Sequence, residues 1–513
     1  MQWKVTVKTD TETRTETIQS TSAITHMQCD IQGTMQSVTA STRLDVSKED
    51  VLFFNGYQTW SYCKEVHSNG YQKGLQHIPQ KLLDTYHFDR YGDYHFYTYP
   101  HKKGIFQGYT YMYIRHENTY HLLASVNEEP GYTIFHYDHG ILTLTRDCAG
   151  LEVHGTFPVF DPWFKAMHVL PKTTQKLYGY SSWYNHYENI SSSTIHEDLE
   201  GCKKILQHGD LFQIDDGWQP CTGDWLEYDP HKFPNGLRYE TDKIHTAGFQ
   251  AGLWAAPFTA SVHSQLVKEH PDWLLQVEGK PWFIGSNWDG AYALDIDHPE
   301  VIAYLEKVFD QIFNEWNFDL VKLDFLYAAA PFGSSAESRS ARMYRANRLL
   351  RKLCKDHPIL GCGVPTCTSF GLFEYNRTGC DVSLDWNDVW YMHFFHRERV
   401  STKHFIANTI FRRQLNTRAY GSDPDVFFLR EDNIRLTSSQ KEALITLDAL
   451  LGNVFLTSDN PNTYTEKQIA QYRYYRHLSS ATNIHCSFTG TVCTITYTLD
   501  GVTQAFHYDT KNL

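Results

Sequence analysis

This chain of 513 residues lacks the features that mark several large classes of protein. Lys and Arg total 46 against 59 Asp and Glu, which gives a net charge of −13 instead of the basic face of a nucleic-acid-binding protein. No apolar run approaches the ~18 residues that a membrane-spanning helix needs. The first residues, Met-Gln-Trp-Lys-Val-Thr-Val, do not form the basic-then-apolar pattern of a signal peptide. We therefore expect a cytoplasmic protein with no nucleic-acid and no membrane partner.

The chain also has little that would hold a metal ion or a nucleotide cofactor. Its eleven Cys include no C-x-x-C pair, which favours free thiols in a reducing compartment. None of the 27 His forms a His-x-His pair at a predicted strand end, and the nearest pattern, His136-Tyr-Asp-His139, lies in a different region. Gly361-Cys-Gly363 lacks the third glycine of a dinucleotide loop. We expect neither a metal nor a cofactor.

Aromatic residues are abundant. The chain is 41% hydrophobic and 15% aromatic, with 13 Trp and 33 Tyr, and its length suits about three packed domains. Aromatic rings stack on the apolar faces of sugars, although packing of the core explains most of this excess. The composition indicates a globular protein and mildly favours a carbohydrate ligand.

Residues 1–165 are predicted to form an all-β domain, a β-sandwich. Apolar and polar residues alternate there, as in Trp3, Val5 and Val7, and we find no run with helical periodicity. The turn within Phe53–Ser61 carries aromatic residues where loops are usually polar. Either it packs against a neighbouring domain, or Trp60 reaches into a neighbour's pocket.

Residues 166–465 alternate short apolar strands with helical stretches, which is typical of βα units around a parallel sheet. Eight such units favour a (β/α)₈ TIM barrel over a doubly wound open sheet, because no phosphate-binding loop follows a strand. Helices are expected at 298–314 and 338–355. The eight predicted strands are Leu177–Trp183, Leu211–Ile214, Gln250–Ala255, Leu320–Phe325, Ile359–Val364, Asp381–Leu384, Thr417–Gly421 and Val454–Thr457.

Residues 466–513 return to β character. Asp500-Gly501 is a favoured hairpin turn, so we expect a small C-terminal β domain attached to the barrel. The predicted fold is therefore a β-sandwich, a (β/α)₈ barrel and a C-terminal β domain.

Two charged residues interrupt the apolar stretch Asn317–Tyr327. Lys322 and Asp324 are two positions apart, so on a strand they point to the same side. Burial makes an ion pair a poor source of stability, whereas a nearby Lys can keep a buried carboxylate ionised for use as a nucleophile or base. A structural salt bridge is the alternative interpretation.

Polar and aromatic residues gather at the carboxyl ends of nearly all the predicted strands, the end of a barrel that usually carries the active site. Arg377 instead precedes the predicted sixth strand, which begins at Asp381 and runs to Asp385. Each could have a structural role, but their common position on one rim is hard to explain by packing alone. Carboxylates and indoles without a metal cluster indicate sugar chemistry, since glycoside cleavage needs one carboxylate at the anomeric carbon and one acid for the leaving oxygen. These residues are Trp183, Asp215, Asp216, Trp254, Lys322, Asp324, Cys362, Arg377, Asp381 and Asp385.

Six motifs between about residues 50 and 460 together closely resemble the α-galactosidases of glycoside hydrolase family 36. They are Asn55-Gly-Tyr-Gln-Thr-Trp60, Gln213-Ile-Asp-Asp-Gly-Trp218, Gly252-Leu-Trp-Ala-Ala-Pro257, Val321-Lys-Leu-Asp-Phe325, Arg377-Thr-Gly-Cys-Asp-Val382 and Ser422-Asp-Pro-Asp-Val426. The resemblance implies a β-supersandwich, a (β/α)₈ barrel, a small C-terminal β domain and retaining hydrolysis of terminal α-galactosyl groups.

The resemblance also implies roles for single residues. Asp324 corresponds to the nucleophile and Asp381 to the acid/base, with Asp385 as the rival of Asp381. Asp215 and Asp216 resemble the clamp on the 4- and 6-hydroxyls, where galactose differs from glucose. The remaining predicted contacts are the cations Lys322 and Arg377 and the pocket walls Trp60, Trp183, Trp254 and Cys362.

Four alternatives stay open from the sequence. An α-N-acetylgalactosaminidase or a galactosyl transferase would use the same scaffold, and a glucose-selective enzyme is disfavoured by the adjacent Asp pair. A catalytically silent sugar-binding protein would have no need of the Lys-flanked Asp324 facing an acid. Because the chain is shorter than the large tetrameric members of the family, we infer no oligomeric state from them.

Overall fold

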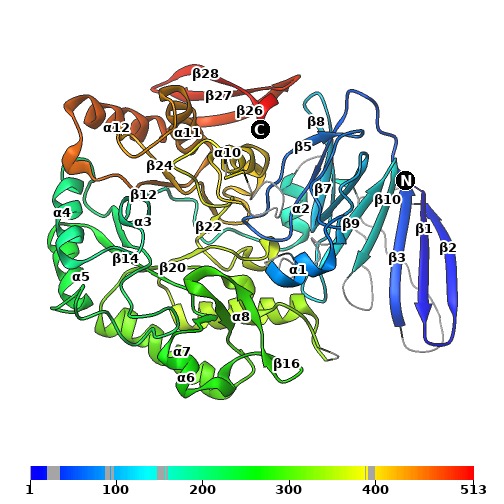
Figure 1. The fold of residues 1–513 in the computed structure, drawn as a ribbon. Coiled ribbons are helices and arrows are strands. Elements are labelled where there is room, and N and C mark those ends of the chain that lie inside the picture. The colour runs from blue at the N-terminus through cyan, green and yellow to red at the C-terminus, as the bar shows by residue number, and fades with distance from the viewer. Residues whose placement is uncertain are drawn as a thin grey trace.

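The computed structural model comprises an N-terminal β region, a parallel barrel ringed by helices, and a C-terminal antiparallel sheet (Figure 1). This architecture confirms the predicted fold class. It describes residues 2–19, 35–86, 93, 98–146, 156–157, 160–334, 336–387, 389–390 and 399–513.

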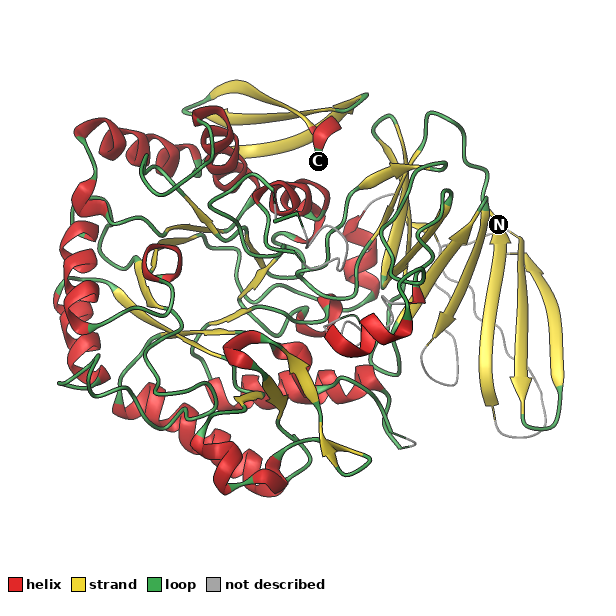
Figure 2. Ribbon diagram, viewed as in Figure 1, coloured by secondary structure: helices red, strands yellow, loops and turns green. Residues whose placement is uncertain are grey.

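Two antiparallel sheets make up the N-terminal region, which lies beside the barrel (Figure 2). One has the order β2-β1-β3-β10-β9-β6 and the other the order β11-β8-β7-β4-β5. Their strands are β1 (Gln2–Thr9), β2 (Thr13–Gln19), β3 (Met35–Arg43), β4 (Val51–Phe54), β5 (Glu65–His67), β6 (Ile105–Tyr109), β7 (Tyr111–His116), β8 (Thr119–Ala124), β9 (Thr133–Asp138), β10 (Ile141–Arg146) and β11 (Thr156–Phe157).

The alternation along β4 explains how this region joins the barrel. Leu52 and Phe54 lie in the core between the two sheets, whereas Phe53 points the other way and belongs to the core shared with the barrel. The five-stranded sheet is therefore apolar on both faces. Against the prediction of an all-β region, the described part also contains the short helix α1 (Gln80–Tyr86).

Eight parallel strands form the barrel, and the seventh is split in two. Its first half, β23, pairs with β22 and its second half, β24, pairs with β25, so that the sheet closes. The barrel strands in order are β12 (Leu177–Ser181), β13 (Leu211–Ile214), β14 (Gln250–Ala255), β20 (Leu320–Leu323), β21 (Ile359–Gly361), β22 (Tyr375–Arg377), β23 (Gly421–Asp423) with β24 (Val426–Phe427), and β25 (Val454–Thr457).

Helices surround the barrel and begin where the sequence signals them. Pro299 stands in the first turn of α7, after the cap His298, and Ser338 caps α8. The helices around the barrel include α4 (Ser192–Cys202), α5 (Leu237–Thr246), α7 (Pro299–Asp310), α8 (Arg339–Cys354), α10 (Thr402–Phe411), α11 (Ser438–Leu451) and α12 (Glu466–Leu478). No helix among the described residues is long and apolar enough to cross a membrane.

Four predicted strands end earlier than expected or begin later. The first stops at Ser181, before the short helix that Trp183 opens, and the other three differ for one common reason. Phe325, Gly363 and Thr417 have φ angles of 54°, 58° and 60°, in the left-handed region where a strand cannot continue. The fourth and fifth strands therefore stop at Leu323 and Gly361, and the seventh starts only at Gly421.

The prediction for the sixth strand is wrong. The strand is Tyr375–Arg377, and Asp381–Leu384 lies in the loop that follows it. This strand does not stand out as an apolar run because it contains the polar residues Asn376 and Arg377, both of which are buried in the structure. Arg377 is thus the last residue of the strand, and Asp381 lies four residues beyond it.

The C-terminal region begins with a helix instead of a strand. Residues 466–478 form α12, which packs on α11, so the predicted β character is wrong for this segment. The sheet that follows comprises β26 (Thr482–Thr489), β27 (Val492–Leu499) and β28 (Val502–Asp509). Asp500 and Gly501 form the predicted hairpin turn between β27 and β28, both with positive φ.

Arg412, at the end of α10, ties the N-terminal region to the barrel. Its guanidinium donates to the Asn55 side chain, to the backbone oxygens of Gln58 and Thr59, and to the Thr378 oxygen in the barrel. The side chain is 1% exposed. One buried cation therefore holds the loop that carries Trp60 against the rim.

Replacing Arg412 with Ala should lower the free energy of unfolding by roughly 3 kcal/mol or more, because several buried acceptors lose their donor at once. Arg418→Ala is the matched control. Its ion pair with Asp161 is between side chains 33% and 72% exposed and should contribute below about 1 kcal/mol. Chemical denaturation of both variants measures the difference, and equal losses would contradict this role of Arg412.

Candidate active site

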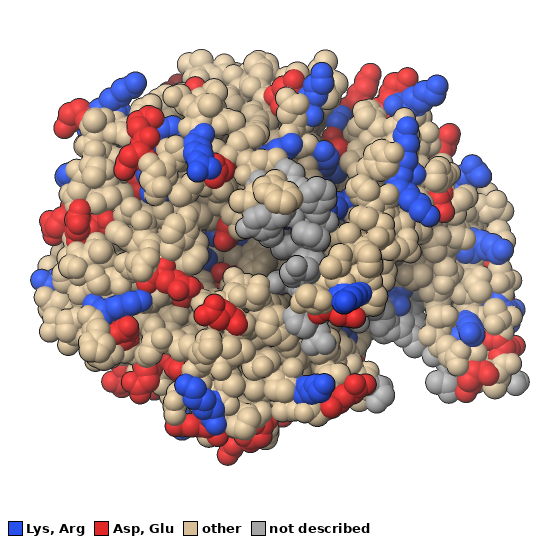
Figure 3. Space-filling view, in the orientation of Figure 1, with Lys and Arg blue, Asp and Glu red and all other residues tan. Residues whose placement is uncertain are grey.

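Strand register brings the predicted residues to one level of the barrel. Leu323 is the partner of Gly361, and Gly361 is the partner of Asn376, so the next residues along, Asp324, Cys362 and Arg377, share one layer. Arg377 in turn pairs with Asp423. These side chains lie just past the carboxyl ends of the strands, where the space-filling view shows the barrel hollowed near its centre (Figure 3).

The Asp324 carboxylate is held at both of its oxygens. The following residue, Phe325, is left-handed, and this turn fixes the direction of the Asp324 side chain. One carboxylate oxygen accepts from the Phe325 N–H at 2.8 Å, and the other accepts from the Trp254 indole N–H at 3.1 Å. Asp324 is 8% exposed. A rigid carboxylate with a defined direction results.

Burial raises the pKa of Asp324, which Lys322 opposes and the neighbouring Asp381 reinforces. This effect of Asp381 on Asp324 indicates that the two carboxyl groups lie near each other. Lys322, however, does not bond to Asp324 as the pattern suggested. Its ammonium donates to Asp215 at 2.9 Å. Burial disfavours its charge, but the Asp215 carboxylate outweighs burial and raises the pKa of Lys322.

Asp381 lies on the loop after β22 and reaches the site through Arg377. The Arg377 Nη1 donates to Asp381 Oδ1 at 2.8 Å. Asp381 is 35% exposed at its side chain, the exposure that an acid open to substrate needs. Its rival Asp385 is 41% exposed and pairs with the exposed Arg435 at 3.3 Å. The electrostatic coupling to Asp324 favours Asp381.

Asp215 and Asp216 are adjacent in the chain but have different surroundings. Asp215 accepts from Lys322, Gln213 and Ser181. Asp216 accepts instead from the Gln219 amide at 2.6 Å and from the Trp288 indole at 2.9 Å. Burial raises the pKa of Asp216 to about 7, although both hydrogen bonds lower it.

The structure also brings Trp60 to this rim. Its indole N–H donates to the Cys362 thiol at 3.1 Å, and its ring packs edge-on against Phe325 at 5.0 Å. The loop is held in place by backbone bonds from Thr59 to Val364 and from Thr366 to Tyr57. Trp183 opens the short helix α3 (Trp183–His186) directly after the first barrel strand. All ten predicted site residues therefore lie at the carboxyl end of the barrel.

Four residues at this rim were missed by sequence reasoning. Asp423 and Asp425 both bond to Arg377 and lie in the Ser422–Val426 motif, but nothing in the sequence assigned them a role. Tyr184 donates to Asp425. Trp288 lies in an insertion that contains the strands β15 (Thr259–Ser261), β18 (Phe283–Gly285) and β19 (Ala291–Ala293), and no local signal marked it.

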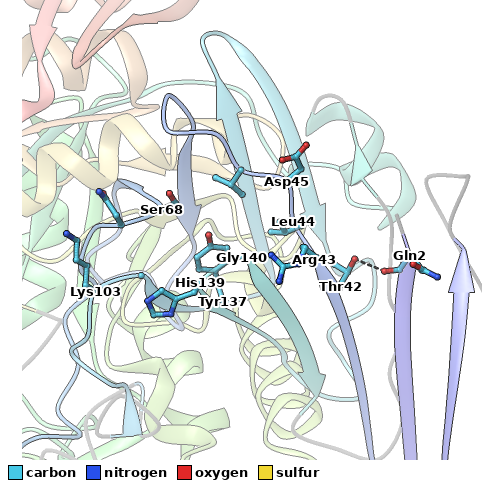
Figure 4. A pocket seen from close by; sticks show the side chains of 13 residues that line it. Gln2, Thr42, Arg43, Leu44, Asp45, Ser68, Lys103, Tyr137, His139 and Gly140 are labelled. Atoms are coloured by element: carbon cyan, nitrogen blue, oxygen red, sulfur yellow. Dashed lines mark hydrogen bonds between the residues drawn. The ribbon is translucent and has the colours of Figure 1, made fainter.

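Two other features of the molecule, a cavity and a cluster of possible metal ligands, do not resemble a catalytic site. A cavity of about 850 Å³ lies at the end of the N-terminal sheets (Figure 4), where Arg43, Lys103 and His139 are exposed and Asp45 is the only acidic lining residue. Among the described residues, Asp272, His298 and Glu300 have the spacing of metal ligands. His298 Nδ1 accepts from the Glu300 N–H, which places the ring proton on Nε2 and leaves no lone pair there for a metal.

The fold and the site place two carboxyl groups, Asp324 and Asp381, at the rim of a parallel barrel, an arrangement that suits the cleavage of glycosidic bonds. The family model described as Melibiase matches residues 180–364. This part of the chain is similar to that family, in agreement with the resemblance of the motifs to glycoside hydrolase family 36.

Several known proteins are similar to the chain. The α-galactosidase Mel36A of Lactobacillus acidophilus is 30% identical over 151 residues, which are 28% of this chain and 20% of that protein. An α-galactosidase of Escherichia coli is 32% identical over 152 residues, 28% of this chain and 21% of that protein. The aligned part thus spans about a fifth of the length of these curated relatives.

Solved structures show the same fold over nearly the whole chain. The α-galactosidase TtGalA from Thermus thermophilus, in complex with p-nitrophenyl α-D-galactopyranoside, has a TM-score of 0.73 at 23% identity and covers 91% of this chain and 92% of its own. The α-galactosidase AgaA from Geobacillus stearothermophilus has a TM-score of 0.58 at 13% identity and covers 91% of this chain and 68% of its own.

The raised pKa of Asp216 predicts a pH-dependent stability difference. Between pH 3.8 and about 7 the folded chain retains a proton that the unfolded chain has lost, so this carboxyl lowers stability as the pH rises. The free energy of unfolding of Asp216→Asn, relative to the parent, should therefore increase from pH 4 to pH 7, by up to about 1.4 kcal/mol per unit. Urea denaturation across this range measures it, and a constant difference would refute the assignment.

Proposed function

We propose that this protein is a retaining, metal-independent exo-α-galactosidase that removes terminal non-reducing α-D-galactosyl residues from oligosaccharides. The observation that carries this proposal is that Trp254 holds the Asp324 carboxylate, and that Asp381 lies near enough to help raise the pKa of Asp324. In the proposed double displacement, Asp324 attacks the anomeric carbon while Asp381 protonates the departing oxygen. Asp381 then takes a proton from the water that releases the sugar.

Asp215 and Asp216 supply the proposed specificity for galactose. Each is nearly enclosed, at 2% and 3% exposure, and each already accepts hydrogen bonds from the protein that fix its direction. Substrate hydroxyls would satisfy the remaining lone pairs. A buried acceptor left unpaired by the wrong epimer carries a large penalty, which supports discrimination against glucose.

The proposed substrates are oligosaccharides of the melibiose and raffinose type. TtGalA has been solved in complex with stachyose, and a variant of AgaA in complex with raffinose. A protein of Flavonifractor plautii described as an A type blood α-D-galactosamine galactosaminidase is 34% identical over 125 residues. Activity toward α-linked galactosamine, or toward its N-acetyl counterpart, is therefore the second candidate. A panel of nitrophenyl glycosides, with the product anomer followed by NMR, separates the two candidate substrates. The same panel detects galactosyl transfer, and a complete lack of turnover would indicate a sugar-binding protein.

Asp324→Ala should reduce turnover of nitrophenyl α-galactoside at least about 10⁴-fold, because the attacking group is absent. Added azide should restore part of the rate and give the β-galactosyl azide, since the small anion attacks from the face that Asp324 occupied. Product NMR and initial rates measure both effects. An α-configured azide product, or near-normal activity of the variant, would remove Asp324 from the nucleophile role.

Asp381→Ala should reduce melibiose hydrolysis by about 10²–10⁴-fold. The first step with nitrophenyl galactoside should be affected much less, because nitrophenolate leaves without a proton. Asp385→Ala serves as the matched control, and near-parental rates with both substrates are expected. Comparison of kcat/KM for the two leaving groups decides between these carboxyls, and the opposite pattern would make Asp385 the acid.

A further inference from the structure

Arg377 binds three carboxyl groups with one guanidinium. Its Nε donates to Asp423 at 3.0 Å, its Nη1 to Asp381 at 2.8 Å, and its Nη2 lies 2.9 Å from Asp425. The side chains of Arg377, Asp423 and Asp425 are 2–3% exposed, whereas Asp381 is 35% exposed. The cation thus connects one carboxyl that faces the cavity with two that do not.

Asp425 reaches Arg377 because the seventh barrel strand is interrupted. Between β23 and β24, Asp425 adopts a left-handed φ of 58°, and such an irregularity turns a side chain away from the regular alternation of a strand. Its Oδ2 accepts from the Tyr184 hydroxyl and, at 2.9 Å, from the N–H of Val382, the residue after Asp381. Both oxygens of the Asp425 carboxyl are therefore engaged next to the proposed acid.

A guanidinium bound directly to an acid works against that acid's function. An acid catalyst must hold its proton before the reaction, and a neighbouring cation favours the ionised form. Asp423 and Asp425 place negative charge on the far side of the same guanidinium. In a site with little water, this compensation determines how much of the positive charge of Arg377 acts on Asp381.

We propose that Asp425 is a positioning residue that neutralises Arg377, and thereby allows Asp381 to keep its proton until the leaving oxygen takes it. This inference rests on the proposed function, in which Asp381 is the acid. Asp425 touches no substrate in this scheme and acts through Arg377. Tyr184 supports it from α3 by donating to the carboxyl.

The charged and titratable groups around Asp425 come from several elements. They are Arg377 on β22, Asp381 beyond it, Asp423 on β23, Lys322 on β20, Tyr184 on α3 and Asp448 on α11. Burial, with the charges of Asp381 and Asp423, outweighs the two cations and raises the pKa of Asp425 to about 7. Its negative charge therefore grows as the pH rises through neutrality, when Asp381 most needs help to retain its proton.

The test is the pH dependence of kcat/KM for melibiose in Asp425→Asn. Asn keeps the size of the side chain but removes the charge, so Asp381 should lose its proton more easily and the alkaline limb should move to lower pH by about one unit. Above neutral pH the variant should lose roughly tenfold on melibiose but little on nitrophenyl galactoside, whose leaving group needs no proton. Tyr184→Phe removes a hydrogen bond that favours the ionised form of Asp425. It should therefore move the alkaline limb in the same direction, toward lower pH, by a smaller amount.

Asp448→Asn is the matched control. Asp448 is 2% exposed, neither of its carboxyl oxygens has a hydrogen-bond partner among the described residues, and burial raises its pKa far above the usual range. The raised pKa favours the neutral form of Asp448, and Asn is neutral as well. This variant should retain the parental pH profile.

The outcomes are distinguishable. If Asp425→Asn lowers kcat/KM for melibiose without changing its pH profile, or moves the alkaline limb to higher pH, the proposal is overturned. Asp425 would then have a structural role only. Should Asp425→Asn not fold, as judged by thermal denaturation, Tyr184→Phe decides by the same profile. Absence of α-galactosidase activity in the parent protein would refute the proposed function itself, independently of the role of Asp425.

Discussion

Two buried cations organise the rim of this barrel. Lys322 lies on β20 and pairs with Asp215, and Arg377 lies on β22 and pairs with three carboxylates. A buried charge without a partner costs several kcal/mol, so the acidic residues that accompany these cations are required by the fold as well as by the chemistry. Lys322 holds Asp215, and Arg377 holds Asp381, Asp423 and Asp425. The directions of four carboxyl groups follow from these two side chains.

The indole and amide donors around the site complete this arrangement. Trp254 fixes Asp324, and Trp288 with Gln219 fixes Asp216. Each donor satisfies part of a carboxylate without supplying a full charge, which leaves lone pairs for a ligand. Burial raises the pKa of Asp216 and of Asp324, so the surroundings of both side chains disfavour the ionised carboxylate. Shifted pKa values of this kind are common among residues that transfer protons or attack a substrate.

The order of the strands and much of the rim could be predicted from the sequence, because apolar runs of four to six residues stand out against helical stretches. Three of the eight predicted strands, for example Val454–Thr457, have the observed bounds. The sixth strand could not be found, because Asn376 and Arg377 are polar residues buried by tertiary partners. Trp288 was missed for a related reason, since only the folded insertion brings its indole to Asp216.

The sequence by itself determined which residue types stand at the ends of several strands, and hence that Asp324, Asp215 and Asp216 gather at one end of the barrel. This holds because parallel strands place their carboxyl ends together. Only the tertiary structure decided the partners: Lys322 bonds to Asp215 instead of Asp324, and Arg377 is shared among three carboxyls. Partner choice depends on distances between residues far apart in the chain, and on left-handed turns such as that at Asp425, which no local pattern encodes.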